Sequence, residues 1–245
     1  INYLRIVNEE LVIDDYVLNE TIGPGFRDVI GFLNDMQYTY PNAISFVSGQ
    51  PDETFFQIDK QLSSIDYYVD HLMHSNGASR EVVLNKIGQY SKTKGIVNDI
   101  LADHLRKQEN IKINGEQILV TVGAQEAFAV IVTTLCNREN DEILIEDPSY
   151  IGLSSYAQVF GYSITGVQTD DEGIDTELLE KTILEREALG KKVKLVYVIP
   201  DYQNPSGFSM SILRRQKLLD LAKQYNFFIV EDSVYNSFTY LQKKN

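Results

Sequence analysis

The chain has 245 residues, of which 43% are hydrophobic and 23% are charged, so it can bury a substantial core and has the composition of a globular protein. Its formal net charge of −13 disfavours binding to nucleic-acid phosphates and to anionic membrane surfaces. The single cysteine, Cys136, excludes an intramolecular disulfide, and no apolar run reaches transmembrane length. The first residues lack a signal-peptide pattern, so we expect a cytoplasmic protein.

The first 40 residues carry seven acidic and two basic side chains, and they predict an irregular arm with short helical pieces. Further along, short apolar runs alternate with segments whose apolar residues recur at helical spacing. The runs predict strands over residues 44–47, 118–121, 142–146, 162–167, 194–199 and 227–230. The other segments predict helices over residues 59–74, 97–108, 124–137, 151–160, 175–187 and 211–225. This alternation predicts an α/β fold with a doubly wound, mostly parallel sheet.

The last two predicted strands both end in polar motifs. One runs into Gln203-Asn-Pro-Ser-Gly207 and the other into Glu231-Asp-Ser-Val-Tyr235. Because parallel sheets bind ligands beyond the carboxyl ends of their strands, we expect Asn204, Asp232 and Tyr235 to face one ligand. Each residue alone also suits a structural role, in a turn, as a helix cap or in aromatic packing.

Two further motifs follow predicted strands. Val122-Gly-Ala-Gln-Glu-Ala127 opens a helix, where free backbone N–H groups and the helix dipole favour an anion. Gly123 permits close approach of that anion to the backbone. Glu146-Asp-Pro-Ser-Tyr150 presents the flat face of Tyr150, which suits a flat conjugated ring. An ordinary tight turn and a core tyrosine are the structural alternatives.

Together with Gln89-Tyr-Ser-Lys-Thr-Lys-Gly95, these motifs form an ordered set that resembles the class I/II aminotransferase family of fold type I pyridoxal 5'-phosphate (PLP) enzymes. The resemblance implies that residues 1–45 form an N-terminal arm and part of a small domain. It implies that residues 46–245 form a partial PLP-binding large domain, incomplete at the C-terminus. The implied protein is a homodimer that moves an amino group between an amino acid and a 2-oxo acid.

The resemblance also implies a role for each motif. Asp232 would hold the proton on the pyridine nitrogen of PLP, and Asn204 and Tyr235 would hydrogen-bond its phenolic oxygen, which makes these three the predicted catalytic residues. The remaining predicted contacts are Gly123, Ala124 and Gln125 at the cofactor phosphate, Tyr150 on the ring, Tyr90 of one subunit at the phosphate of the other, and Gly49 near the substrate carboxylate.

The sequence departs from the family pattern in one respect. It contains neither the Ser-x-x-Lys-type motif whose lysine forms a Schiff base with PLP nor the C-terminal arginine that grips the substrate carboxylate. The resemblance therefore implies a fragment that is inactive by itself. Two alternatives stay open: another fold type I PLP enzyme (a lyase, decarboxylase or cyclase), or the ligand-sensing aminotransferase-like domain of a transcription regulator. We expect no metal site, because no cysteine or further histidine accompanies His71 and His74.

Overall fold

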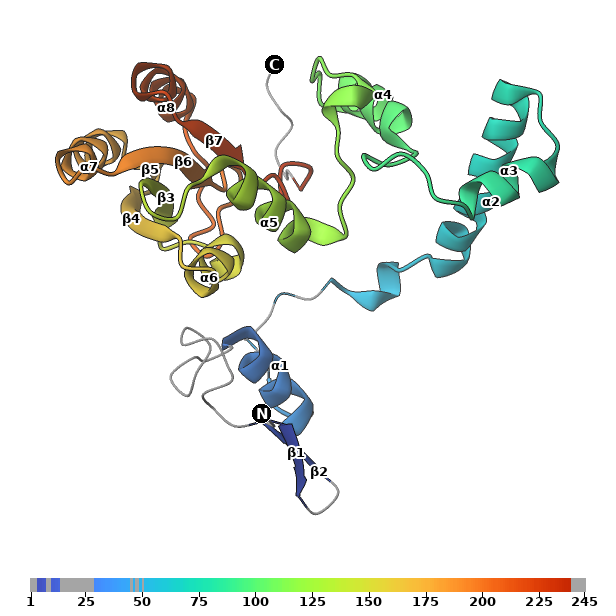
Figure 1. The fold of residues 1–245 in the computed structure, drawn as a ribbon, viewed down its shortest axis with the longest axis horizontal. Helices are drawn as coiled ribbons and strands as arrows, with labels where there is room; N and C mark the ends of the chain where they lie inside the picture. The colour runs from blue at the N-terminus through green and yellow to red at the C-terminus, as the bar shows by residue number, and fades with distance from the viewer. Residues whose placement is uncertain are drawn as a thin grey trace. The chain divides into compact units, whose positions relative to one another are not determined.

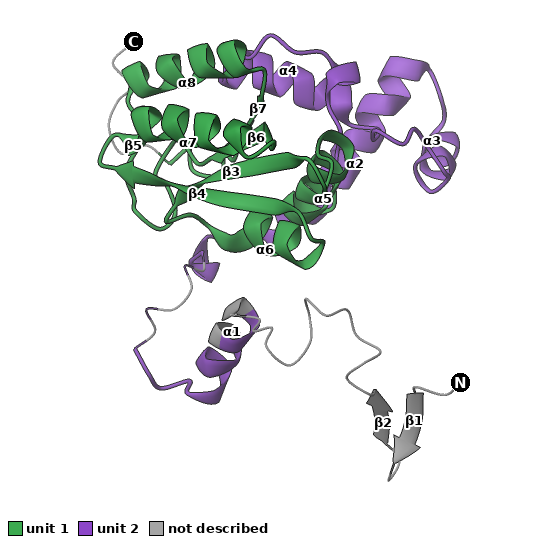
Figure 2. Cartoon of the chain, turned by 60° about the vertical axis from the view of Figure 1, so that its left-hand side comes forward, with its two compact units in different colours: residues 1–26, 121–245 green, residues 27–120 purple. Residues whose placement is uncertain are grey.

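The computed structural model describes residues 4–7, 10–13, 29–44, 46, 49 and 51–238. The chain divides into two compact units, one made of residues 1–26 and 121–245 and the other of residues 27–120 (Figures 1 and 2). Within the described residues, no helix combines the length and the apolar character that crossing a membrane requires.

The first unit is built on a five-stranded sheet in the order β5-β4-β3-β6-β7. The strands β4, β3, β6 and β7 run parallel, and only the short β5 pairs antiparallel with β4. Consequently β7 has a neighbour on one side only among the described residues. The bounds of the strands are β3 Asp141–Asp147, β4 Ser163–Asp170, β5 Gly173–Ile174, β6 Lys192–Val198 and β7 Phe228–Glu231. A separate antiparallel pair joins β1 (Leu4–Val7) to β2 (Glu10–Ile13).

Helices cover both faces of this sheet, so the predicted doubly wound α/β fold is confirmed (Figure 2). One apolar cluster joins Ile143 and Tyr197 of the sheet to α5 and α6. A second cluster joins the alternate strand residues Leu144 and Val196 to α7 and α8. Successive side chains of a strand point to opposite faces, which is why neighbouring apolar residues feed different clusters. The bounds of these helices are α5 Gly123–Leu135, α6 Ile151–Val159, α7 Thr176–Ala188 and α8 Ile212–Tyr225.

Side-chain caps set where two of these helices begin. Asp175 accepts hydrogen bonds from the backbone N–H groups of Glu177 and Leu178 at the start of α7. Ser211 accepts one from Arg214 at the start of α8. Such caps satisfy backbone donors that have no partner within the helix, so each helix begins close to the residue that the sequence predicts.

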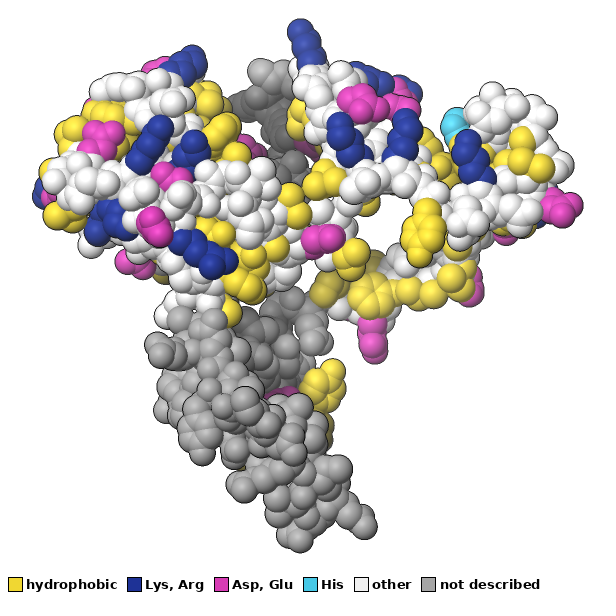
Figure 3. All heavy atoms as spheres, viewed as in Figure 1, with side chains coloured by type: hydrophobic (Ala, Val, Ile, Leu, Met, Phe, Trp, Pro, Cys, Tyr) yellow, Lys and Arg dark blue, Asp and Glu magenta, His cyan; other side chains and the backbone are white. Residues whose placement is uncertain are grey.

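The second unit contains α1 (Val29–Thr39), α2 (Ile58–Asn76), α3 (Arg80–Ile87) and α4 (Asn98–Gln108), with short helical turns η3 (Glu53–Phe55) and η4 (Gly115–Gln117). The helices predicted over 59–74 and 97–108 are confirmed, whereas α3 was not predicted. Apolar side chains of α2 remain exposed, and Figure 3 shows apolar surface over this helix and the segment before it. They include Leu62, Ile65 and Tyr67, which are 63%, 59% and 75% exposed.

One predicted strand is wrong. Residues 118–121 form no strand, because no other strand of the described residues pairs with them. The N–H of Ile118 instead bonds Gly115, and the N–H of Val120 bonds Lys94, which holds the segment as an extended connection. The strand predicted over 44–47 lies partly outside the described residues, and Ile44 and Phe46 are in no strand.

Candidate active site

Asp232 lies at the carboxyl end of the sheet, directly after β7. Its backbone N–H donates to the carbonyl of Val198 at 2.9 Å, which fixes the turn beside the end of β6. Its Oδ2 accepts a hydrogen bond from the hydroxyl of Tyr197 at 2.7 Å. Tyr197 is completely buried, and this burial, with the neighbouring carboxylate second, raises the pKa of its hydroxyl. Tyr197 therefore stays a neutral donor and holds Asp232 in one orientation.

Asn204 and Tyr235 come together from two loops. The Asn204 Nδ2 donates to the Tyr235 hydroxyl at 3.5 Å, and both side chains are partly buried. Asn204 follows β6, and Tyr235 lies three residues beyond Asp232. Because β6 and β7 are adjacent and parallel, the structure brings these two residues to the carboxyl end of the sheet, where Asp232 lies.

The rings of Phe128 and Tyr197 link Tyr150 to the carboxyl end of the sheet. Tyr150 is the residue before α6 and is 37% exposed. A Cβ atom added to Gly152 would lie 2.6 Å from Tyr150 Cε1 and 3.2 Å from Phe128 Cε2, so both rings pack over that glycine. The Phe128 ring in turn meets the Tyr197 ring edge to face, with 5.7 Å between centroids. The exposed part of Tyr150 is therefore available to a ligand close to Tyr197.

The N-terminus of α5 is open at the position of the predicted anion site. Gly123 has φ +78, which favours glycine, and a Cβ atom there would have no neighbour within 4 Å. Phe128 anchors the first turns of the helix to Tyr197, so this N-terminus lies on the same side of the sheet as Asp232. Gly123, Ala124 and Gln125 are all exposed. The carboxylate of Glu126 accepts from the N–H of Val122, so the chain itself occupies one of the backbone donors here.

A buried carboxylate, Glu146, contacts the loop that carries Asn204 and was not predicted as part of the site. It is 1% exposed at the end of β3, and its Oε2 accepts from the N–H of Ile199 at 3.0 Å and from Gln203 Nε2 at 3.3 Å. Its Oε1 has no hydrogen-bond partner among the described residues. Burial raises the pKa of Glu146 to about 7 and outweighs the two hydrogen bonds, which act in the opposite direction.

This shifted pKa predicts a pH-dependent stability. The unfolded chain releases the Glu146 proton near 4.5, whereas the folded chain keeps it up to about pH 7. Since the folded state binds more protons between these values, its stability falls as pH rises through that window, by about 3 kcal/mol in all. Urea unfolding at pH 5 and pH 7.5 should show this loss in the wild type relative to Glu146→Gln, which cannot titrate. Equal pH dependence of the two proteins would contradict it.

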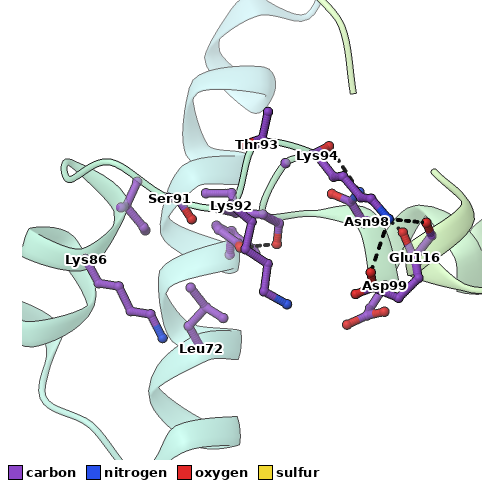
Figure 4. A pocket seen from close by; sticks show the side chains of 14 residues that line it. Leu72, Lys86, Ser91, Lys92, Thr93, Lys94, Asn98, Asp99 and Glu116 are labelled. Carbon is purple, nitrogen blue, oxygen red and sulfur yellow. Dashed lines mark hydrogen bonds and ion pairs between the residues drawn. The ribbon is translucent and has the colours of Figure 1, made fainter. Parts of the chain in front are cut away.

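Tyr90 and Gly49 belong to the other unit, and their roles stay predictions. Tyr90 is fully exposed in the loop after α3, and a Cβ atom added at Gly49 would meet no atom of the described residues within 4 Å. The loop that follows Tyr90 borders a cavity of about 570 Å³ that the sequence did not predict (Figure 4). Lys86 and Lys92 point into it on either side of Leu72.

Three hydrogen bonds, two of them partly buried, hold the far wall of this cavity. Asn98 Nδ2 donates to the carbonyls of Lys94 and Ile118 at 3.1 and 2.7 Å, and Lys94 Nζ donates to the carbonyl of Glu116 at 2.8 Å. These contacts fix the segment from Lys94 onward against η4 (Figure 4). The loop that carries Tyr90 therefore has a rigid base.

The residues of the first unit fit a PLP molecule. The carboxylate of Asp232, oriented by Tyr197, suits a ring N–H, and the Asn204 and Tyr235 side chains offer hydrogen-bond donors to a ring oxygen. The open helix N-terminus at Gly123 suits a phosphate. Tyr150 offers an exposed aromatic face.

Comparison with known proteins agrees with this arrangement. The chain is 37% identical over 209 residues to the (S)-3,5-dihydroxyphenylglycine transaminase of Amycolatopsis orientalis, a match that covers 85% of this chain and 48% of that protein. It is 33% identical over 156 residues to YisV of Bacillus subtilis, named an uncharacterized HTH-type transcriptional regulator, with 63% of this chain and 31% of that protein covered.

Among solved structures, the kynurenine aminotransferase of Pyrococcus horikoshii, determined in complex with PMP, superposes with a TM-score of 0.69 at 28% identity. The match covers 89% of this chain and 51% of that one. The chain thus spans about half the length of the transaminase relatives it matches. Residues 80–244 match the family described as aminotransferase class I and II. The chain belongs to that family.

Proposed function

We propose that the complete protein is a PLP-dependent aminotransferase that moves an amino group between an amino acid and a 2-oxo acid. The observation that carries this proposal is that Asp232 and the Asn204–Tyr235 pair follow the carboxyl ends of two adjacent parallel strands, β6 and β7. The match to a transaminase at 37% identity and the likeness to a PMP-bound aminotransferase support it. We propose residues 46–245 as part of the PLP-binding large domain and residues 1–45 as an arm with part of a small domain.

Each side chain has a task in this proposal. When bound, PLP supplies an electron sink for the charge that develops at the substrate Cα. Asp232 holds the proton on the ring nitrogen, and Tyr197 keeps the Asp232 carboxylate turned toward that atom. Asn204 and Tyr235 orient the ring through its phenolic oxygen. The backbone at Gly123, Ala124 and Gln125 binds the phosphate, and Tyr150 stacks on the ring.

We also propose that the protein acts as a homodimer in which Tyr90 of one subunit reaches the cofactor phosphate of the other. Tyr90 is fully exposed, which leaves it free to contact a partner. The exposed apolar side chains of α2 support an association surface in the same unit. Gly49 as a neighbour of the substrate carboxylate and a cytoplasmic location stay predictions.

An assay of the complete protein tests the reaction type. The protein is loaded with PLP and incubated with a panel of amino acids, with and without a 2-oxo acid, and the products are separated by chromatography. We expect a new amino acid to form from the 2-oxo acid, in equal amount to the donor consumed. Consumption of many donor molecules per bound PLP without an acceptor would indicate a lyase or decarboxylase, since an aminotransferase can consume only one per PLP. Binding without turnover would favour a ligand-sensing domain, for which the match to YisV gives a reason.

A further inference from the structure

Two loops that carry proposed cofactor contacts are joined by one side chain, Gln203. Its Nε2 donates to the carbonyl of Pro148 at 2.7 Å and to Glu146 Oε2 at 3.3 Å. Its Oε1 accepts from the N–H of Ser206 at 2.9 Å. The side chain is 3% exposed, so both its donors and its acceptor are used inside the protein.

Glu146 attaches Gln203 to the central strands of the sheet. It belongs to β3, in the middle of the sheet, and its Oε2 also accepts from Ile199 at the end of β6. One oxygen atom thus ties the end of β3 to the end of β6 and to the loop that follows β6. Burying a carboxylate is costly, and here only one of its two oxygens has a partner among the described residues.

We propose that Glu146 is a positioning residue that, through Gln203, holds Asn204 and Tyr150 at a fixed spacing. Asn204 is the next residue after Gln203, and Tyr150 lies two residues after Pro148. Loss of the connection frees the two loops from each other, and the two proposed cofactor contacts move apart. This inference rests on the proposed function for its catalytic consequence, but its structural consequence does not depend on bound PLP.

The chain offers a matched control in Glu142. Glu142 is on the same strand, is also 1% exposed, and also has one oxygen without a partner among the described residues. Its Oε1 accepts from the Thr165 hydroxyl at 2.6 Å, and among the described residues its side chain makes no hydrogen bond to either loop. Replacing Glu142 therefore removes an equally buried carboxylate without releasing Gln203.

The test compares Glu146→Ala, Glu146→Gln and Glu142→Ala in the complete protein, with two measurements. Amide hydrogen exchange in the cofactor-free protein reports the N–H groups of Ile199 and Ser206. In Glu146→Ala these amides should exchange at least about tenfold faster than in the wild type, while β6 keeps its protection. Glu146→Gln keeps an oxygen acceptor and should keep the protection, and Glu142→Ala should leave both amides unchanged.

The second measurement is steady-state kinetics with saturating PLP. Glu146→Ala should lower kcat by about 10- to 100-fold, as expected when reacting groups are misplaced by about 1 Å, and Glu146→Gln should restore most of it. If Glu146→Gln loses as much kcat as Glu146→Ala with its amides still protected, Glu146 acts through its charge and the proposal is overturned.

Other outcomes would also decide whether Glu146 positions the two loops. Unchanged exchange in Glu146→Ala, or equal loosening in Glu142→Ala, would overturn the proposal. If Glu146→Ala does not fold, Gln203→Met takes its place, since it keeps the side-chain length and removes the hydrogen bonds. Faster exchange of Ile199, whose acceptor Glu146 is kept in that variant, would support the connection, and wild-type exchange would refute it. A complete protein without transaminase activity would end the proposed function, while the exchange experiment would still decide the positioning role.

Discussion

Replacing Asp232 with alanine in the complete protein should lower turnover by at least about 100-fold, on the scale seen when a group that stabilises developing charge is removed. Asp232 is the acidic side chain at the carboxyl ends of β6 and β7 that we assign to the PLP ring nitrogen. Without it, the ring nitrogen has no group to hold its proton. Stability should fall by only about 1–3 kcal/mol, because the buried Tyr197 hydroxyl loses its acceptor.

The measurement is kcat at saturating PLP, with urea unfolding as the test of folding. Glu231→Ala is the control, because Glu231 is the adjacent carboxylate and is exposed, with Ser233 as its hydrogen-bond partner. This control should keep both turnover and stability. Near-normal turnover of Asp232→Ala would show that Asp232 is not the partner of the ring nitrogen.

Replacing Gly123 with valine should weaken PLP binding by at least about tenfold. The branched side chain would fill the open space at the N-terminus of α5, and the backbone at φ +78 would be strained by about 1–2 kcal/mol. Both effects disturb the N–H groups that we assign to the phosphate. The affinity of the complete, cofactor-free protein for PLP can be measured by equilibrium dialysis.

Gly161 provides the control for backbone strain. It has φ +73 and likewise has no atom within 4 Å of an added Cβ, but it follows the C-terminal end of α6. Gly161→Val should therefore lose similar stability and keep its affinity for PLP. If both variants bind PLP equally well, the phosphate does not bind at the N-terminus of α5.

The sequence predicted the four parallel strands and the helices α5 to α8 because their patterns are strong and local, but it did not predict the two-residue β5 or the β1–β2 pair in the N-terminal arm. The β-branched runs that end near Val198 and Val230 and the polar turns after them indicate strands, and the structure pairs these two runs with each other. Residues 118–121 carry the same kind of apolar run, yet a strand needs a partner, and a sequence does not reveal whether one is present. The eight-residue helix α3 was missed because it is too short to establish a helical period.

The site residues that belong to sequence motifs were predicted. The site residues that were missed are recognisable only from their contacts in the folded structure. Asn204 and Tyr235 were expected together and do meet. Tyr197 lies inside an apolar run that predicts only a strand, and its hydrogen bond to Asp232 depends on the register of β6 against β7. One signal for Glu146 was present in the sequence. It lies two residues after Leu144 on the same strand, so the two side chains point to the same face, and both are buried.

The position of β7 at the edge of the sheet has a practical consequence. Its outer backbone groups have no strand partner among the described residues, and Phe228 is 49% exposed. The Lys194 ammonium lies 5.6 Å from the centre of the Phe228 ring, beside this short edge. Edges of this kind recruit strands from other copies of a chain. Expressed by itself, this polypeptide should therefore self-associate by strand addition as its concentration rises.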